Sequence, residues 1–268
     1  MSTLPPSPTW TGSALHLDVV IAVAVLAGAY VAGLVLSAHP RSAGRAVAFF
    51  LGLAALLVAT NGPLHVLSEG YLFTAHMVQH LILTLVVPPL LLSGTPGFMV
   101  DAVLARVGAR PARWARLLTR PVPALAAYTV ALVAWHLPGP YELALASHGW
   151  HFVEHAALTG TAILAWWPVL STSREAPALH YGAQILYLFV FGFPMTVVAA
   201  MITTAETVLY PFYSLAPRVI DLSPLDDQRL GGVIMWVPAG LIPLVAFTLV
   251  FFRWVAAEPD DAVDAVPK

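Results

Sequence analysis

Histidine is the residue type in this sequence whose number and spacing could support chemistry. His76 and His80 are four residues apart, and His151 and His155 repeat that spacing further along the chain. Residues at positions i and i+4 lie on one face of a helix, so each pair would present two imidazole rings side by side. Neutral imidazole is a good ligand for zinc, copper, iron and nickel. Two such pairs on different helices could therefore converge on one metal ion.

Further side chains could complete such a site. His148 precedes His151 by about one helical turn, and His136 ends another apolar segment at a similar depth. Met235 could supply a thioether sulfur, a ligand that suits Cu(I). The candidate metal ligands are His76, His80, His148, His151, His155, His136, Asp227 and Met235.

Two acidic residues could assist the histidines. Glu154 stands between His151 and His155 and could accept a hydrogen bond that orients an imidazole ring. Asp227 precedes the last apolar stretch, where it could cap that helix at its N-terminus and also face the histidines.

Simpler roles for these polar residues stay open. A single histidine near a membrane surface is often only a polar group that reaches water, and His16, His65 and His136 fit that description when taken singly. A histidine pair can also hydrogen-bond serine, glutamate or backbone groups instead of a metal ion.

The composition indicates a membrane protein. Of the 268 residues, 59% are hydrophobic and only 10% are charged, whereas soluble proteins average about 25% charged residues. Lipid must therefore surround much of the chain. The net charge of −2 gives no reason to expect nucleic acid as a partner. The absence of cysteine excludes disulfides, thiolate metal sites, thiol nucleophiles and cysteine-ligated iron–sulfur clusters.

The apolar stretches that must position the histidines predict an all-α fold. A helix needs roughly 20 apolar residues to cross the hydrocarbon core of a bilayer. We expect a polytopic membrane helix bundle with about seven transmembrane helices. The predicted spans are residues 15–37, 46–62, 71–93, 122–137, 149–170, 181–204 and 230–252.

The distribution of positive charge predicts the orientation of these spans. Lysine and arginine collect on the cytoplasmic side of membrane proteins. With the N-terminus outside and the C-terminus cytoplasmic, ten of the twelve lysines and arginines lie inside, and only Arg218 and Arg229 lie outside. This orientation also places eight of the ten histidines on the outer side or in the outer half of a span, with only His39 and His180 inside.

The chain is expected to divide into three parts. Residues 1–14 form an external segment, residues 15–254 form the membrane domain, and residues 255–268 form a disordered acidic cytoplasmic tail. Within the membrane domain, the cytoplasmic segment 94–120 carries five arginines among apolar residues at near-helical spacing. This pattern fits either an interfacial helix on an anionic membrane surface or a basic loop that fixes the orientation.

Three segments resemble those of the CtaG-type assembly proteins of caa3-type cytochrome c oxidase. FTAHMVQHLILTLVVPPLLLSGTP (73–96) is similar to the third span of that family, and WHLPGPYELALASHGWHFVEHAALTGTAILAWWPVL (135–170) is similar to its fourth-to-fifth span region. LSPLDDQRLGGVIMWVP (222–238) is similar to the start of its last span. The resemblance covers about residues 46–254, and the ordered combination of HMxQH, WHxPxxY, HxxxH and DQxxGGxxMW is specific.

The resemblance implies a multi-pass protein of the bacterial plasma (inner) membrane that helps to assemble a haem–copper oxidase at the stage of copper insertion. The implied partners are an oxidase subunit, membrane lipid and a periplasmic or extracellular copper donor. Copper is implied by the resemblance alone, because the spacing does not separate copper from zinc. The motif positions are His76, His80, His136, His148, His151, His155, Asp227, Gln228, Met235 and Trp236, whereas His65 has no place in the motifs.

The leading hypothesis is thus an assembly factor, not an enzyme, that holds a copper ion at the outer face and passes it on by ligand exchange. An intramembrane zinc-dependent hydrolase is an alternative, because three histidines, a zinc-bound water and a nearby carboxylate could hydrolyse a lipid. A haem-binding membrane cytochrome is another, because histidines on facing helices can clamp a haem. A metal-ion transporter would need polar groups through the inner half of the spans, where they are sparse.

Overall fold

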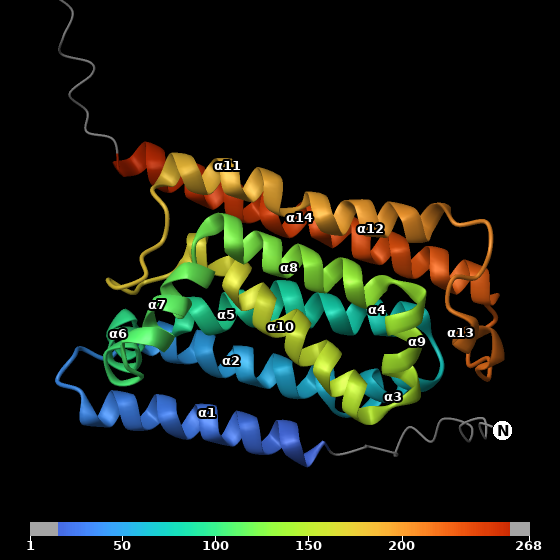
Figure 1. Ribbon diagram of the computed structural model, residues 1–268, viewed down its shortest axis with the longest axis horizontal. Helices are drawn as coiled ribbons and strands as arrows, with labels where there is room; N and C mark the ends of the chain where they lie inside the picture. The colour runs from blue at the N-terminus through green and yellow to red at the C-terminus, as the bar shows by residue number, and fades with distance from the viewer. Residues whose placement is uncertain (1–15, 258–268) are drawn as a thin grey trace, which may run out of the picture.

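The computed structural model describes residues 16–257, which form a bundle of helices with no strand among them (Figure 1). The all-α fold class is therefore confirmed. The predicted external segment 1–14 and residues 258–268 of the predicted tail lie outside the described residues. The elements are α1 (Leu17–Leu36), α2 (Ala43–Thr60), α3 (Pro63–Gly70), α4 (Phe73–Leu81), a π-helical turn η1 (Ile82–Val86), α5 (Val87–Gly94), α6 (Gly97–Arg106), α7 (Ala109–Leu118), α8 (Pro121–His136), α9 (Pro138–Ala146), α10 (His148–Leu170), α11 (Tyr181–Phe191), α12 (Phe193–Thr204), α13 (Pro211–Leu215) and α14 (Pro224–Ala257).

Five helical stretches in the described residues are long and apolar enough to cross a membrane: α1, α2, α4 through α5, α11 with α12, and α14. A sixth is reached if α7 and α8, which meet at a bend of 77°, count as one span. The predicted span 149–170 forms α10, but its histidines and Glu154 lower its mean hydropathy, and it is not among these stretches. Length and composition support a multi-pass membrane protein with five or six spans, and seven spans and the orientation of the termini stay predictions.

Two predicted boundaries can be compared with the helices. The basic segment 94–120 contains two short helices, α6 and α7. Asp101 of α6 accepts hydrogen bonds from Ser173 Oγ at 2.5 Å and from the backbone N–H of Arg174 at 3.2 Å, which tie α6 to the connection between α10 and α11. At the other end, α14 continues to Ala257, so the last helix runs past the predicted domain boundary at residue 254.

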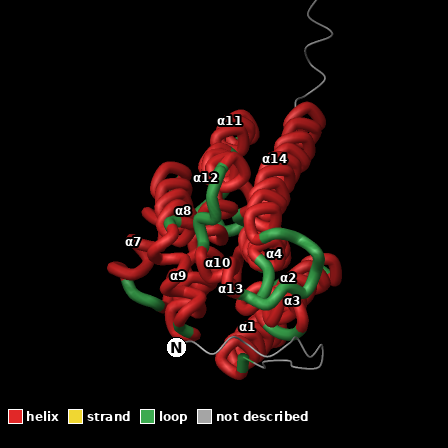
Figure 2. The backbone as a smooth tube through the Cα atoms, turned by 90° about the vertical axis from the view of Figure 1, so that its right-hand side faces the viewer, coloured by secondary structure: helices red, strands yellow, loops and turns green. Residues whose placement is uncertain are grey.

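The central element of the bundle is the helix formed by α4, η1 and α5. Most of its residues are buried, whereas only Val23 and Tyr30 of α1 are. α5 packs against α2 and α10, and α4 packs against α14. Figure 2 shows α1 at one edge of the bundle, with α11 and α12 beside α14 at the other. The histidine pair on α4 therefore lies in the interior of the protein.

Two glycines allow the central helix to approach its neighbours closely. A Cβ atom at Gly94 would lie 2.4 Å from the backbone nitrogen of Phe49, and one at Gly231 would lie 2.4 Å from the ring of Phe73. Neither position has room for a side chain. α2 thus contacts α5 at Gly94, and α14 contacts the start of α4 at Gly231.

A proline in the central helix fixes α10 against it. Pro88 has no backbone N–H, so the carbonyl of Thr84 lacks the donor that a regular helix would supply. The indole Nε1–H of Trp166, on α10, donates to that carbonyl at 3.1 Å. This buried hydrogen bond holds together the two helices that carry the histidine pairs.

Candidate metal centre

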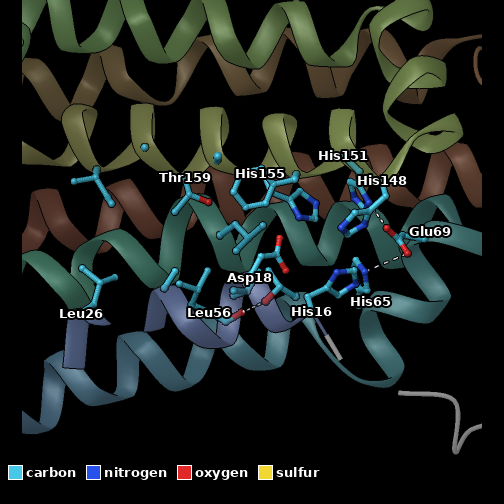
Figure 3. Close-up of a pocket in the computed structure, with 18 of the residues that line it drawn as sticks. His16, Asp18, Leu26, Leu56, His65, Glu69, His148, His151, His155 and Thr159 are labelled. Atoms are coloured by element: carbon cyan, nitrogen blue, oxygen red, sulfur yellow. Dashed lines mark hydrogen bonds and ion pairs between the residues drawn. The ribbon is translucent and has the colours of Figure 1, made fainter. Parts of the chain in front are cut away.

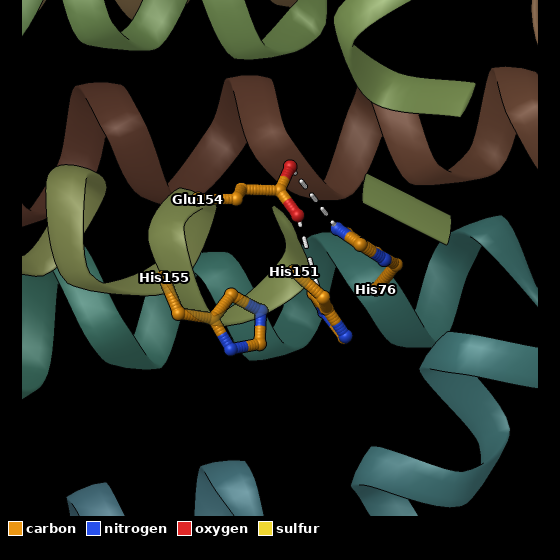
Figure 4. Close-up of side chains that lie close together, drawn as sticks. All are labelled: His76, His151, Glu154 and His155. Atoms are coloured by element: carbon orange, nitrogen blue, oxygen red, sulfur yellow. Dashed lines mark ion pairs between the residues drawn. The ribbon is translucent and has the colours of Figure 1, made fainter. Parts of the chain in front are cut away.

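Four side chains with metal-ligating atoms meet between α4 and α10 (Figure 4). His76 comes from α4, and His151, Glu154 and His155 come from α10. One nitrogen or carboxylate oxygen of each lies within 4.8 Å of the others. His76 and Glu154 are completely buried, His151 is 3% exposed and His155 is partly buried. We call these four residues the buried cluster.

The distances between ligand atoms in the buried cluster are close to those around a bound metal ion. His76 Nε2 lies 3.8 Å from Glu154 Oε1, and His151 Nε2 lies 3.9 Å from Glu154 Oε2. His80 adjoins the cluster, with its Nε2 at 2.8 Å from His76 Nε2 and 3.7 Å from Glu154 Oε1. A tetrahedral ion with ligands at 2.0–2.1 Å holds neighbouring ligand atoms about 3.4 Å apart. Small side-chain adjustments would bring the four ligand atoms to that spacing.

The unpartnered polar atoms of the buried cluster fit a cation. Among the described residues, Nε2 of His151, Nε2 of His155 and both carboxylate oxygens of Glu154 are buried without a hydrogen-bond partner. Burying such atoms unpaired is costly, and a charged carboxylate costs the most. A metal ion would accept these lone pairs and compensate the carboxylate charge, so the residues present fit a metal.

A second carboxylate, Glu69 of α3, orients one ring of the cluster. Its Oε1 forms a short hydrogen bond with Nδ1 of His151 (Figure 3). If His151 is neutral and donates through Nδ1, its Nε2 keeps a free lone pair on the side of Glu154. Burial alone would raise the pKa of the Glu69 carboxyl, but the hydrogen bonds from His151 and His65 outweigh it and hold that pKa well below its usual range. A carboxylate that fixes a histidine in this way is typical of metal sites.

His65 is held in one tautomer by Gln79. The Gln79 atom at 2.7 Å from the carbonyl of Ala59 must be the amide nitrogen, because a carbonyl only accepts. The same nitrogen lies 2.9 Å from Nδ1 of His65 and donates to it. A neutral His65 then carries its proton on Nε2, which lies 3.2 Å from Oε2 of Glu69. Gln79, His65, Glu69 and His151 thus form a continuous chain of polar contacts that ends at the buried cluster.

A second group of metal-ligating atoms lies nearer the surface. It contains Glu69, which also contacts His151 of the buried cluster. His16, Glu69 and His148 each offer an atom within 4.8 Å of the others, and the rings of His16 and His148 stack with centroids 4.9 Å apart. We call these three residues the outer group. A largely apolar pocket of about 240 Å³ is lined by the outer group and by His151 and His155 of the buried cluster (Figure 3). Its polar lining residues are His16, Asp18, Thr60, His65, Glu69, His148, His151, His155 and Thr159.

Two further predicted residues lie on the other side of His80. His136, at the end of α8, is 1% exposed, and its ring centroid is 5.6 Å from that of His80. Met235 of α14 is 2% exposed and lines a small cavity together with both histidines. The structure therefore brings His136 and Met235 close to the first histidine pair, next to the buried cluster.

Asp227 has a different position from the predicted one. Its carboxylate accepts hydrogen bonds from the backbone N–H groups of Phe73 at 2.9 Å and Thr74 at 3.0 Å, so it caps α4. The first N–H groups of a helix have no partner inside it, and here they are buried against α14. Asp227 does not join either group of ligands, nor does it cap its own helix α14. Ser223 has that role, since its Oγ accepts from the N–H of Asp226 at 3.1 Å.

Other motif positions divide between structural and surface roles. His148 is exposed and belongs to the outer group, not to the buried cluster with His151 and His155. Gln228 is buried, and its Oε1 accepts from the backbone N–H of Leu209 at 2.6 Å. Trp236 is 42% exposed and lies outside the site.

Sequence reasoning assigned no ligand role to His16, His65 or Glu69. His65 and Glu69 are four residues apart and therefore share a helix face, a spacing that was open to the same argument as the histidine pairs. His16 carries no comparable signal, because it reaches the site only through the packing of α1.

Comparison with known proteins gives a family and distant relatives. Residues 28–257 match the model of a family described as cytochrome c oxidase caa3 assembly factor. The chain is 24% identical over 225 residues to an uncharacterized protein of Mycobacterium bovis, covering 79% of this chain and 34% of the relative. It is 25% identical over 259 residues to an uncharacterized protein of Mycobacterium leprae, covering 89% of this chain and 39% of the relative. The chain thus spans between a third and two fifths of the length of these relatives, and no solved structure matches it.

Proposed function

The chain belongs to the cytochrome c oxidase caa3 assembly factor family, and from this membership we propose that it carries a copper ion in the buried cluster and passes it to a haem–copper oxidase subunit. The observation that supports the proposal is the convergence of three imidazoles and a carboxylate. Among the described residues, Nε2 of His151, Nε2 of His155 and both oxygens of Glu154 have no hydrogen-bond partner. The membership supports a role in oxidase assembly, and the ligand set supports a metal ion as the cargo.

The chemistry of the ligands suits a cargo that must be released. Imidazole nitrogen and carboxylate oxygen bind copper and zinc alike, and no thiolate is present to hold the ion more firmly. Glu154 supplies negative charge that offsets the charge of the ion in a buried position. Copper is preferred to zinc because the family assembles a copper enzyme.

The two groups of ligands suggest a route for the ion. A cation that arrives at the outer group meets His16, His148 and Glu69 first. Glu69 also contacts His151, which belongs to the buried cluster. The ion can therefore move by exchanging one ligand at a time. Only coordination bonds are made and broken, and no catalytic step is needed.

The setting of this transfer is also part of the proposal. Multiple apolar helices support a membrane location, and the matched relatives are bacterial. We propose a multi-pass protein of the bacterial plasma membrane, with the oxidase subunit beside it in the same bilayer. A periplasmic or extracellular copper donor would deliver the ion at the outer group.

Metal analysis of the purified full-length protein tests the proposal. Wild-type protein loaded with copper should retain at least one copper ion per chain, and a His76→Ala/His80→Ala double variant should retain almost none and fail to support oxidase assembly. His180→Ala is the matched control, because His180 is exposed at the start of α11 and belongs to neither group of ligands. Full assembly of active oxidase by the double variant would refute the proposal.

Removing the charge of Glu69 is expected to weaken copper binding without abolishing it. Glu69→Gln can still accept a hydrogen bond from His151, but it no longer stabilises the proton on Nδ1 electrostatically. Partners of this kind typically contribute about 10–100-fold to metal affinity. Competition with a copper chelator should show a loss of that size, whereas the exposed Glu206→Gln should match wild type. Unchanged affinity in Glu69→Gln would mean that the ion does not bind through His151.

A further inference from the structure

A second small cavity adjoins the buried cluster at His80. It has a volume of about 10 Å³ and lies among α4, α8, α10, α12 and α14. This volume is close to that of one water-sized sphere, so it can hold a single ion but not a haem. Its chemically distinctive lining residues are Met77, His80, Thr84, His136, Met195 and Met235.

The methionine sulfurs come from three different helices. Met77 belongs to α4, Met195 to α12 and Met235 to α14, and they are 1%, 4% and 2% exposed. Methionine is also a common filler of irregular cores, so burial by itself does not indicate a ligand. The indication of a metal site comes from His136, which lines the same cavity.

His136, which lines this cavity, has a ring nitrogen with a free lone pair. Its Nδ1 lies 2.7 Å from the backbone carbonyl of Leu132, and because a carbonyl only accepts, Nδ1 must carry the proton. Nε2 of the neutral ring is then an unprotonated acceptor. It is buried and has no hydrogen-bond partner among the described residues. A histidine whose other ring nitrogen is fixed by a backbone carbonyl is oriented as metal-binding histidines usually are.

His80 belongs to both sites. Its Nε2 faces His76 and Glu154 of the buried cluster, whereas its Nδ1 is buried without a hydrogen-bond partner. Its ring centroid is 5.6 Å from that of His136. The imidazole of His80 thus lies between the buried cluster and a cavity lined by methionine and histidine side chains.

We propose that this cavity is a separate site for Cu(I), formed by His80, His136 and the thioethers of Met77, Met195 and Met235. Thioether sulfur is a soft ligand that selects Cu(I), whereas Zn²⁺ and Cu(II) favour nitrogen and oxygen ligands such as those of the buried cluster. The inference rests on the proposed function and deepens it, because His80 can pass the ion between the sites without contact with water. Imidazole also binds Cu(I), so copper can stay Cu(I) in both sites and the transfer needs no electron.

Anaerobic Cu(I) titration of the full-length protein against a chromogenic chelator tests the second site. Met195→Leu/Met235→Leu conserves side-chain volume and removes two sulfurs, so the fold should persist. Residues that only orient a metal ligand contribute about 10–100-fold to metal affinity. Loss of two direct ligands should therefore lower the affinity for one equivalent of Cu(I) by at least that factor. Zn²⁺ binding, which reports on the buried cluster, should be unchanged. Met201→Leu is the control, because Met201 is 48% exposed on the same helix as Met195.

X-ray absorption of the Cu(I)-loaded protein provides a second measurement. Wild type should show sulfur scattering around copper, and the double methionine variant should not. Unchanged Cu(I) binding in that variant, or no sulfur signal in wild type, would overturn the second site. If His76→Ala/His80→Ala still binds both metals and supports assembly, the proposed function itself fails, so the two failures are distinguishable.

Discussion

Replacing Glu154 by glutamine is expected to abolish metal binding and, at the same time, to stabilise the metal-free protein. Glu154 is completely buried, and its oxygens lie 3.7 to 3.9 Å from the imidazole nitrogens of His76, His80 and His151, which is too far for hydrogen bonds. In the metal-free state its charge is poorly compensated, so a neutral side chain of the same shape should raise the free energy of unfolding by about 1–3 kcal/mol. With metal, the same substitution removes the only carboxylate of the buried cluster.

Equilibrium dialysis with copper or zinc and thermal unfolding of the metal-free protein in detergent measure the two effects. Glu206→Gln makes the same chemical change at an exposed position and should alter neither quantity. Retained metal binding in Glu154→Gln would show that the ion does not bind in the buried cluster. A lower unfolding temperature of the metal-free variant would show that Glu154 instead forms a stabilising ion pair with protonated histidine.

Asp227→Asn is expected to destabilise the protein by about 3 kcal/mol, since each hydrogen bond to a charged buried group is worth about 1.5–3 kcal/mol. The carboxylate accepts from two backbone N–H groups at the start of α4, and it is completely buried. Asparagine offers one oxygen, and its amide nitrogen would face the second donor. Because α4 carries His76 and His80, metal affinity should fall together with stability.

The unfolding of the metal-free protein separates this structural role from metal ligation. A cap stabilises the protein whether or not metal is bound, whereas a ligand does so only when metal is bound. Asp221→Asn, at an exposed position a few residues upstream, serves as the control and should be neutral. Normal stability of metal-free Asp227→Asn, combined with lost metal binding, would restore the role predicted from sequence.

The sequence was informative wherever helical geometry alone decides the outcome. The spacing of His76 and His80, and of His151 and His155, placed each pair on one helix face. The structure brings a ring nitrogen of His76 within 4.8 Å of one nitrogen each of His151 and His155. The apolar stretches likewise predicted the positions of the long helices. Their count was less certain, because α10 combines a membrane-length helix with several polar residues.

Contacts between distant segments could not be derived in this way. Asp227 lies 154 residues from the backbone group of Phe73 that it caps, and no local pattern links the two positions. Glu69 and His151 are 82 residues apart, so their pairing depends on how α3 packs against α10. The position of His148 also depends on packing, because α10 turns that ring toward His16 instead of His76.

The polar N-terminal half of α10 also bears on how the protein is made. A nascent helix leaves the insertion channel for lipid when its side chains favour hydrocarbon, and histidine and glutamate near its start oppose that step. α10 is therefore expected to depend on α4 and η1, which are synthesised earlier and offer it the ring of His76 and the carbonyl of Thr84. Biogenesis and metal handling would then impose opposite demands on one segment. Leucines in place of these histidines would let α10 insert unaided, but they would remove its metal ligands.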